Sequence, residues 1–415
     1  MSEIFEKING YVWGNGLIFL LLITGIIFTF RLGFIQLKLP KFLVRNTKIQ
    51  NSGLSQFKTV CMSLGTTMGT GNITGAASAL AIGGAGSIFW MWVSAFLGMS
   101  IVYMENILSA KYSDDFTKGP MAYLSKGLKC SALAYVFAIF CILASLGMGG
   151  MVQVNTFTES LADCCNFNNI IVFVIIFIII YIVISGGAER IGTATQYLLP
   201  VASVAYAVIC IVILCIFRGN IISVIKKIFT EAFDFSSAFG GFSGYAISVG
   251  IRRGIFSNEA GLGSSPILHS AAGETSAHAQ GMWSMFEVFF DTIICCTLTA
   301  VTVLCASDSF SIAETFSSVL GNFSTPFITA ELGIFAFCTV IGWYYCGETA
   351  FRYLTGKSSG SKTFCIIYAL AASSGALFTA KSVWTVSDIF NGLMAIPNLI
   401  GLLLLMNSVK KNKPD

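Results

Sequence analysis

The stretch from Gly65 to Gly75, GTTMGTGNITG, interrupts an apolar segment that is long enough to cross a lipid bilayer. Within it, Gly69 and Gly71 flank Thr70, and Asn72 follows. Glycine lets the chain leave a helix at little steric cost, which frees backbone N–H and C=O groups. In hydrocarbon these groups need partners, so such a break persists only where it lines a cavity or a bound ion. The stretch therefore predicts a broken transmembrane helix with a binding site at the break.

Close helix packing is the competing explanation for these glycines, because small residues let helices approach one another. Asn72 favours the break, since a polar side chain at mid-bilayer is an unusual choice for packing. A second stretch, Gly250 to Pro266, GIRRGIFSNEAGLGSSP, interrupts a later apolar segment in the same way. Two interrupted spans at matching positions of two chain halves indicate the binding site of a transporter.

The composition is that of a membrane protein. Of the 415 residues, 55% are hydrophobic and 11% are charged, whereas a soluble domain carries about 25% charged residues. The formal net charge of +4 is small and gives no case for nucleic-acid binding. Most of the 13 cysteines lie in apolar spans, where a thiol behaves as a small hydrophobe. No cleavable signal is expected, because no small-residue cleavage site accompanies the first apolar run.

Hydropathy predicts about eleven transmembrane helices. We expect them near residues 13–31, 60–82, 86–111, 131–157, 168–186, 197–217, 240–266, 280–304, 327–354, 362–380 and 384–407. Loops on one side carry seventeen lysines and arginines, and loops on the other side carry five. Because positively charged loops stay in the cytoplasm, we expect a multi-pass protein of the plasma membrane, with its N-terminus outside and its C-terminus in the cytoplasm.

Without the first span, ten remain, and each interrupted span is then the first of a group of five. The two groups run in opposite directions, which is the inverted repeat of many secondary transporters. We also expect an amphipathic cytoplasmic helix near 41–57, an outer surface helix near 221–233 and an outer cover near 308–323. The predicted parts are the N-terminal span with its amphipathic helix, two five-helix repeats and a tail, at 1–59, 60–217, 218–407 and 408–415.

Several polar groups at the first break are candidates for binding. The backbone N–H groups of Thr70 and Gly71, with the half-helix that begins near Asn72, could hold a carboxylate. Carbonyl oxygens from Gly65 to Met68, at the end of the first half-helix, suit a hard monovalent cation. Thr339, in a later span, could add its hydroxyl oxygen to that cation.

Charged residues also lie at membrane depth, where a charge is costly unless it faces a cavity or a partner. Arg252 and Arg253 belong to the second interrupted span. Glu287 and Asp291, one helical turn apart in the next span, are their expected partners. We favour structural or gating ion pairs over contact with a substrate. Gln153 could reach a bound ligand, and an ordinary interhelical hydrogen bond is the alternative.

Four motifs are similar to those of one family, the alanine or glycine:cation symporters, also called the sodium:alanine symporter family. They are GTGNITG at 69–75, GSIFWMWVSAFLGM at 86–99, RRGIFSNEAGLGSSP at 252–266 and WYYCGE at 343–348. The resemblance covers nearly the whole chain. Two positions depart from the family pattern. Ala85 stands where the family usually has proline, and Cys338 stands where a hydroxyl residue is expected, so a softer sulfur ligand would weaken sodium binding there.

The resemblance implies a sodium-driven importer of a small neutral amino acid, alanine or glycine above all, which works by alternating access. It implies an all-α fold of the leucine-transporter type, with a 5+5 inverted repeat and two broken helices. No organic cofactor is implied, and sodium is the coupling ion. The implied substrate site comprises Thr70, Gly71, Asn72, Gln153, Phe256, Asn258, Gly342 and Trp343. The implied sodium site comprises Gly65, Met68, Cys338 and Thr339.

Other interpretations remain open at this point. A proton-coupled symporter or an exchanger would have the same spans, although both histidines are expected in or near a cytoplasmic loop. An intramembrane serine protease of the rhomboid type is suggested by GFSG around Ser243 and AHAQG around His278, but these lie at opposite ends of their spans, and we expect no enzyme. A channel is disfavoured, because no selectivity-filter repeat is present. The preferred amino acid, the stoichiometry and the oligomeric state are not predicted.

Overall fold

The computed structural model describes residues 2–45, 55–165, 167–233, 242–272, 276–307, 309–356 and 361–409. Within these ranges the chain forms helices joined by short connections and no β-strand. This confirms the all-helical fold class for the described part of the chain.

Seven helices are long and apolar enough to cross a membrane, namely Ile4–Arg31, Gly86–Tyr112, Ser131–Cys164, Gly187–Ile216, Ala277–Ala306, Ile312–Thr355 and Ala380–Ser408. Two shorter apolar helices are Asn169–Ile184 and Lys362–Leu377. These helices are those of a polytopic membrane protein. The two remaining predicted spans, near 60–82 and 240–266, are each interrupted and form no continuous long helix. The count of eleven therefore stays a prediction.

The individual helices outside the two breaks have the following bounds. The first part of the chain, up to residue 216, contains α1 (Ser2–Val12), α2 (Asn15–Arg31), α3 (Leu39–Arg45), α6 (Gly86–Tyr112), α7 (Gly119–Ala122), α8 (Ser131–Ala144), α9 (Gln153–Cys164), α10 (Asn169–Ile184) and α11 (Gly187–Ile216). The remainder contains α12 (Ile221–Ala232), α15 (Ala277–Val288), α16 (Thr297–Ala306), α17 (Ile312–Leu320), α18 (Ser324–Thr355), α19 (Ser361–Ser374) and α20 (Ala380–Leu405). The π-helical segments Ser145–Val152 and Phe289–Cys296 join α8 to α9 and α15 to α16.

The first predicted break is confirmed. Helix α4 (Gln56–Thr67) ends at Met68, and Gly69 is extended, with φ −93° and ψ −157°. A single 3-10 turn, Thr70–Asn72, precedes helix α5 (Thr74–Gly83). The second half-helix thus begins two residues later than expected, because Asn72 still belongs to the turn.

The second predicted break is also confirmed. It separates α13 (Phe242–Asn258) from α14 (Ser264–His269). The connection turns sharply, since Glu259, Gly261 and Gly263 all have positive φ. A side chain at Gly261 would approach Leu21 to 2.5 Å, so glycine serves both the conformation and the packing there.

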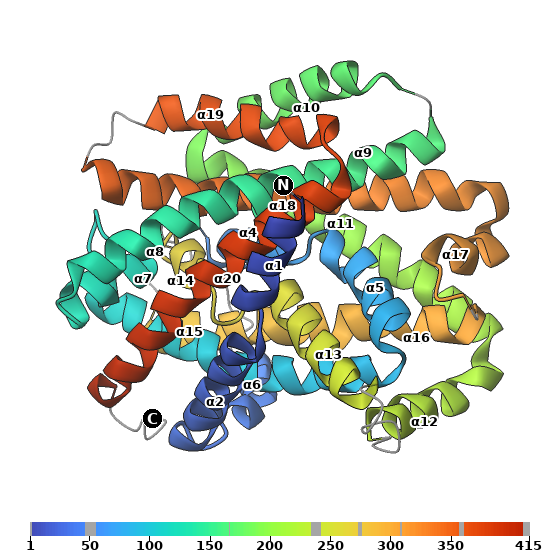
Figure 1. Cartoon of the computed structure of the whole chain (residues 1–415), viewed down its shortest axis with the longest axis horizontal. Coiled ribbons are helices and arrows are strands. Elements are labelled where there is room, and N and C mark those ends of the chain that lie inside the picture. Colours follow the sequence, from blue (N-terminus) through green and yellow to red (C-terminus); the bar gives the residue numbers. More distant parts are fainter. Residues whose placement is uncertain are drawn as a thin grey trace.

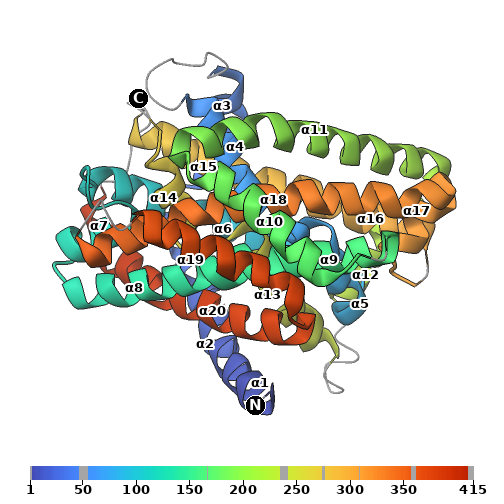
Figure 2. The same cartoon turned by 90° about the horizontal axis from the view of Figure 1, so that it is seen from above.

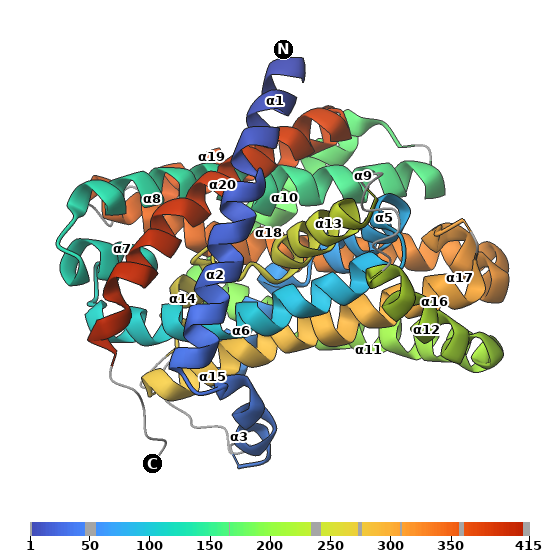
Figure 3. The ribbon, with the colours of Figure 1, turned by 60° about the horizontal axis from the view of Figure 1, so that its bottom comes forward.

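The long helices share one general direction. Figures 1 and 2 show α6, α9, α11, α16 and α18 running roughly parallel to the horizontal axis. Helices α5, α12 and α17 lie at one end of this bundle, and α7 and α14 lie at the other. Helix α5, which follows the first break, and helix α14, which follows the second, therefore lie toward opposite ends of the bundle. Figure 3 shows α1 and α2 crossing the bundle obliquely beside α20.

Three helices test the predicted surface elements. Helix α12 confirms a helix near 221–233, and α17 with the 3-10 turn Gly321–Phe323 makes 312–323 helical. Helix α3 covers only the start of 41–57, because residues 46–54 lie outside the described residues. In α12 the residues Val224, Ile228 and Ala232 are buried and four positions apart, so one face packs inward. That face lies against α6 and α16. Their positions relative to a membrane stay predictions.

Candidate functional site

The free backbone of the first break is held by one buried amide. The Thr70 N–H and the Thr70 hydroxyl both donate to Gln153 Oε1, each at 3.1 Å. The Gln153 Nε2 donates to the Met148 carbonyl at 3.2 Å, in the π-helical segment that precedes α9. All three residues are buried. The amide of Gln153, in α9, thus supplies the hydrogen-bond partner that a free backbone N–H needs inside a membrane.

Aromatic rings close one side of the break. A side chain at Gly71 would touch the Phe256 ring at 3.9 Å. Phe256 stacks on Trp384 of α20, with ring centroids 5.3 Å apart and planes at 27°. The absence of a side chain at Gly71 leaves its backbone accessible to this ring pair. Phe256 therefore lies beside the first break, together with Trp384, which the sequence did not indicate.

Oxygen atoms from two distant segments meet on the other side of the break. The Thr339 hydroxyl donates to the Gly65 carbonyl at 2.9 Å, which joins α18 to the end of α4. A Cβ atom at Gly65 would lie 3.2 Å from Cys338 Cβ, so Cys338 packs against the same turn. Met68 is buried in the same apolar cluster as Cys338. Carbonyl and hydroxyl oxygens at a helix end are suitable donors for a hard cation, so these residues fit the expected sodium site.

A second oxygen cluster lies around Asp291, which is fully buried. Its carboxylate accepts from Asn72 Nδ2 at 2.7 Å, from Ser257 Oγ at 2.7 Å and from Thr292 Oγ1 at 2.9 Å. Asn258 Nδ2 in turn donates to Thr292 Oγ1 at 3.1 Å. The cluster joins both breaks to the π-helical segment Phe289–Cys296. A buried carboxylate among neutral donors needs a proton or a cation to compensate its charge.

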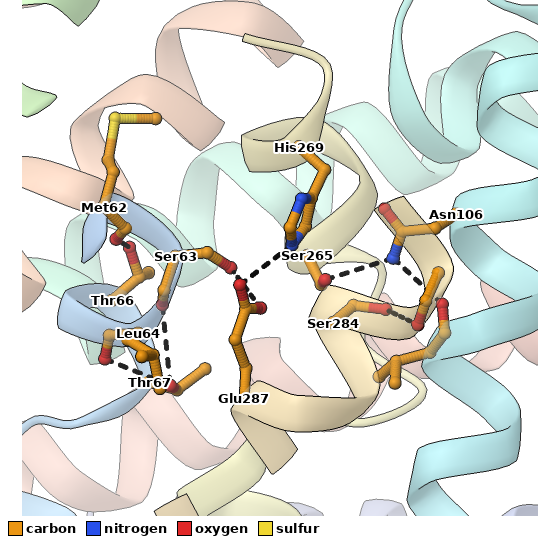
Figure 4. Close-up of polar contacts among 12 residues, drawn as sticks. Met62, Ser63, Leu64, Thr66, Thr67, Asn106, Ser265, His269, Ser284 and Glu287 are labelled. Carbon is orange, nitrogen blue, oxygen red and sulfur yellow. Dashed lines mark hydrogen bonds and ion pairs between the residues drawn. The ribbon is translucent and has the colours of Figure 1, made fainter. Parts of the chain in front are cut away.

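The expected partners of Arg252 are wrong. Arg252 pairs with Asp388 of α20 at 3.2 Å and also donates to Asn9 Oδ1 at 3.3 Å. Glu287 instead bonds to His269 and Ser63 (Figure 4), and Asp291 bonds to the neutral groups named above. The reason is helix rotation: the face of α13 that carries Arg252 points toward α1 and α20. Arg253 lies with its guanidinium 5.9 Å from the Trp384 ring centre.

Gly342 and Trp343 of α18 are positioned by packing. A Cβ atom at Gly342 would lie 2.0 Å from Thr66 Oγ1, so this glycine allows α18 to approach α4. The Trp343 Nε1 donates to Glu259 Oε1 at 2.9 Å, and a Cβ atom at Gly149 would lie 2.3 Å from Trp343 Cβ. These contacts tie the indole to the second break. A tryptophan motif alone does not reveal which break its ring adjoins.

The side chain of Ser243, the nucleophile of the protease alternative, lies outside the described residues. His278 Nδ1 lies 2.8 Å from the Tyr103 hydroxyl. Three residues at or near the breaks were missed by the sequence analysis: His269, Trp384 and Asp388. Only spatial neighbours distinguish them, because a single histidine, tryptophan or aspartate outside the two motifs has no local signal of function.

Two interrupted helices, whose backbone meets buried amide, hydroxyl and carboxylate groups inside a bundle of long apolar helices, are features of a polytopic membrane transporter. Comparison with known proteins then gives the family. The chain belongs to the sodium:alanine symporter family, whose sequence profile matches residues 1–415. The resemblance of the four motifs is thereby confirmed.

Individual relatives align with nearly the whole length of the chain. It is 38% identical to the sodium/alanine symporter AgcS of Methanococcus maripaludis, over 99% of this chain and 98% of the relative. It is 35% identical to the amino-acid carrier protein AlsT of Bacillus subtilis, over 98% and 90%. It is also 35% identical to the probable sodium/glutamine symporter GlnT of Bacillus subtilis, over 99% and 90%. These relatives support sodium-coupled symport of an amino acid and speak against an enzyme.

Proposed function

We propose that the chain imports a small neutral amino acid, alanine or glycine, together with sodium by alternating access. The observation that carries the proposal is the first break, where Gln153 holds Thr70 and the Phe256 ring faces Gly71. This arrangement presents backbone and amide groups beside aromatic rings in a buried place. The relative AgcS is a sodium/alanine symporter, which supports alanine as the first substrate to test.

Each polar group of the substrate is assigned to protein groups of complementary hydrogen-bonding character. Thr70, Gly71 and Asn72 are proposed to receive the carboxylate, because the turn and the start of α5 supply N–H groups. Gln153, Asn258 and the backbone near Phe256 are proposed for the amino group, because they offer oxygen acceptors. Phe256, Gly342 and Trp343 are proposed to limit the size of the substrate side chain.

Sodium is assigned to the oxygen atoms at the end of α4. Gly65, Met68 and Thr339 are the proposed donors, and Cys338 is the proposed weak ligand. The Asp291 cluster is a second candidate, because it supplies a carboxylate beside Asn72 and Ser257. Both clusters adjoin the turn that is proposed to hold the amino acid. Binding of either solute would order the same turn, which is a physical basis for coupling.

The topology is proposed together with the function. Eleven spans follow if each broken helix counts as one span beside the seven long and two shorter apolar helices. We propose a leucine-transporter-type 5+5 repeat, with α4–α11 as the first half and α13–α20 as the second. The N-terminus is proposed to lie outside and the C-terminus in the cytoplasm of the plasma membrane, from the charges of the loops.

Uptake of labelled alanine into proteoliposomes tests the proposal, with and without an inward sodium gradient. We expect accumulation only with the gradient, and competition by unlabelled glycine. Glutamine is the informative competitor, because the relative GlnT is a probable sodium/glutamine symporter. Accumulation driven by a proton gradient without sodium would show that protons are the coupling ion. Uptake of glutamine in place of alanine would show that glutamine is the substrate.

A further inference from the structure

A polar cavity lies at the end of the bundle that holds α7 and α14. Its volume is about 1030 Å³, which is at the upper limit of ordinary ligand pockets, about 300–1,000 Å³. The ends of α10 and α18 and the starts of α11 and α19 surround it. Ser185, Arg352 and Lys362 on its wall are exposed, so the cavity opens to the surface. None of the residues proposed to bind the amino acid or sodium lines it.

The wall of the cavity has an excess of positive charge. Three cationic side chains, Lys118, Arg352 and Lys362, line it together with one acidic side chain, Glu348. Glu348 pairs with Arg352 at 2.9 Å. Lys118 donates to the neutral Ser270 carbonyl at 3.3 Å, and within the described residues neither lysine pairs with an acidic side chain. Three positive charges against one negative charge leave an excess of two, which favours an anionic ligand.

The start of helix α11 adds to this preference. Its first residues, Gly187 and Ala188, line the cavity, and no side chain caps the helix at the preceding Gly186. Free N–H groups at the start of a helix and the positive end of its dipole both attract an anion. The guanidinium of an arginine and the ammonium of a lysine are the usual partners of a phosphate. A phosphate group in the cavity would therefore meet several favourable donors.

Apolar surface suited to acyl chains begins beside the cavity. Helices α10 and α19 contact each other at the edge of the bundle (Figures 1 and 2). Ile178 and Ile182 of α10 and Ile366 and Leu370 of α19 are 44–54% exposed. The members of each pair are four residues apart, so each helix carries an apolar strip on one face. The strip on α10 passes Tyr181, which lines the cavity, and tyrosine is frequent where a membrane meets water.

We propose that this cavity binds the phosphate headgroup of an anionic phospholipid such as phosphatidylglycerol. Basic pockets between transmembrane helices accept anionic headgroups on the cytoplasmic side, and Lys118, Arg352 and Lys362 belong to loops of the side proposed to be cytoplasmic. Free phosphate has the same charge but would leave the two apolar strips uncovered. A neutral amino acid has no net charge to match the excess on the wall. Lipid binding here requires neither sodium nor an amino acid, so it goes beyond the proposed function.

Native mass spectrometry of the purified full-length protein in detergent tests the proposal. The probes are phosphatidylglycerol and phosphatidylcholine with identical acyl chains, because only the first has a net negative charge. We expect one phosphatidylglycerol to bind at least about tenfold more tightly than phosphatidylcholine, since each cationic side chain near an anionic lipid contributes about fivefold in affinity.

Two lysine variants test the position of the headgroup. Lys118→Gln and Lys362→Gln should each weaken phosphatidylglycerol binding by about fivefold. Lys41→Gln is the matched control, because Lys41 of α3 is exposed, lies on the same proposed side and does not line the cavity. The control should change binding by less than about 1.5-fold, since salt screens charges outside the cavity.

A steric variant tests the cavity without changing its charge. Ser185→Trp adds a large side chain to the wall at an exposed position, so folding should be retained. We expect it to weaken phosphatidylglycerol binding by at least about fivefold, because the headgroup and the indole compete for the same space. Binding as in the wild type would contradict the assignment of the lipid to this cavity.

Equal affinities for the two phospholipids would overturn the proposal. Equal losses in Lys41→Gln and Lys362→Gln would also overturn it, because the effect would then be one of net charge alone. Displacement of the lipid by millimolar inorganic phosphate would replace the phospholipid with free phosphate as the ligand. These measurements involve no transport, so failure of sodium-driven uptake would leave them unaffected.

Discussion

At the residue scale, the first break depends on the absence of a side chain at Gly69. A Cβ atom there would lie 2.8 Å from both Gln153 Oε1 and Thr339 Oγ1. Contacts that short force one of the two partners to move. Gln153 holds Thr70, and Thr339 holds the Gly65 carbonyl, so displacement of either affects a proposed ligand group. Because Gly69 has no Cβ atom, both Gln153, in the proposed substrate site, and Thr339, in the proposed sodium site, can approach the same turn.

Gly69→Ala is predicted to lower the apparent affinity for alanine by about 5- to 150-fold, because overpacking of this kind costs about 1–3 kcal/mol. Gly75→Ala is the matched control, since a Cβ atom there meets nothing within 4 Å and Gly75 lies within α5. The control should keep its affinity within about twofold and gain helix stability of about 0.5–1 kcal/mol. Saturation binding of labelled alanine measures both variants.

Equal affinities for Gly69→Ala and Gly75→Ala would show that the contacts at Gly69 do not control the site. Loss of binding in both variants would attribute the effect to any added side chain between Gly69 and Gly75, and not to the contacts of Gly69. Thermal unfolding of each variant separates these outcomes from a loss of folded protein.

At the element scale, the turn between α5 and α6 explains the departure at Ala85. The Ala85 N–H donates to Glu231 Oε2 of α12 at 2.8 Å. Proline, the residue expected at this position from the family resemblance, has no N–H and could not make this bond. The alanine thus attaches α12 to the turn between the first broken helix and α6. The backbone remains compatible with proline, since Ala85 has φ −63° and Gly84 has ψ −177°.

Ala85→Pro is predicted to destabilise the protein by about 1 kcal/mol. It loses a hydrogen bond to a charged group, worth about 1.5–3 kcal/mol, and regains about 0.4–1 kcal/mol from the restricted unfolded chain. Glu231→Ala removes the same bond without that gain, so it should destabilise at least as much. Denaturant unfolding in mixed micelles measures both. Full additivity in the double variant would contradict the account, because two changes that remove one bond cannot each lose it.

At the scale of the whole molecule, the positions of the helix breaks were predictable from the sequence, whereas the partners of the buried charged side chains were not. The glycine-rich stretches marked both breaks, because glycine and polar residues inside an apolar segment are a local signal. The partner of Arg252 was missed, because it depends on the rotation of α13 and on Asn9 and Asp388, which are far away in sequence. His269 was missed for a similar reason, since its direction follows from how α14 packs. The long apolar helices were predictable from hydropathy, whereas the inverted repeat stays a prediction.

Hydrogen bonds connect the two breaks in the whole structure. Asn72 and Ser257, one from each break, meet at Asp291, and Thr339 reaches the first break from α18. A solute that orders the turn Thr70–Asn72 therefore acts on both candidate cation clusters. This connection is the structural basis of the central claim, which is that sodium and the amino acid stabilise each other at one turn.

Equilibrium binding to the purified protein tests that claim most directly. The dissociation constant of alanine is measured at several sodium concentrations, and that of sodium at several alanine concentrations. We predict that each solute tightens the other by the same factor, about 5- to 150-fold, because coupling free energies are reciprocal. Thr339→Val should weaken both affinities and reduce that factor. An alanine affinity that does not change with sodium, or a Thr339→Val variant with both affinities intact, would contradict the account.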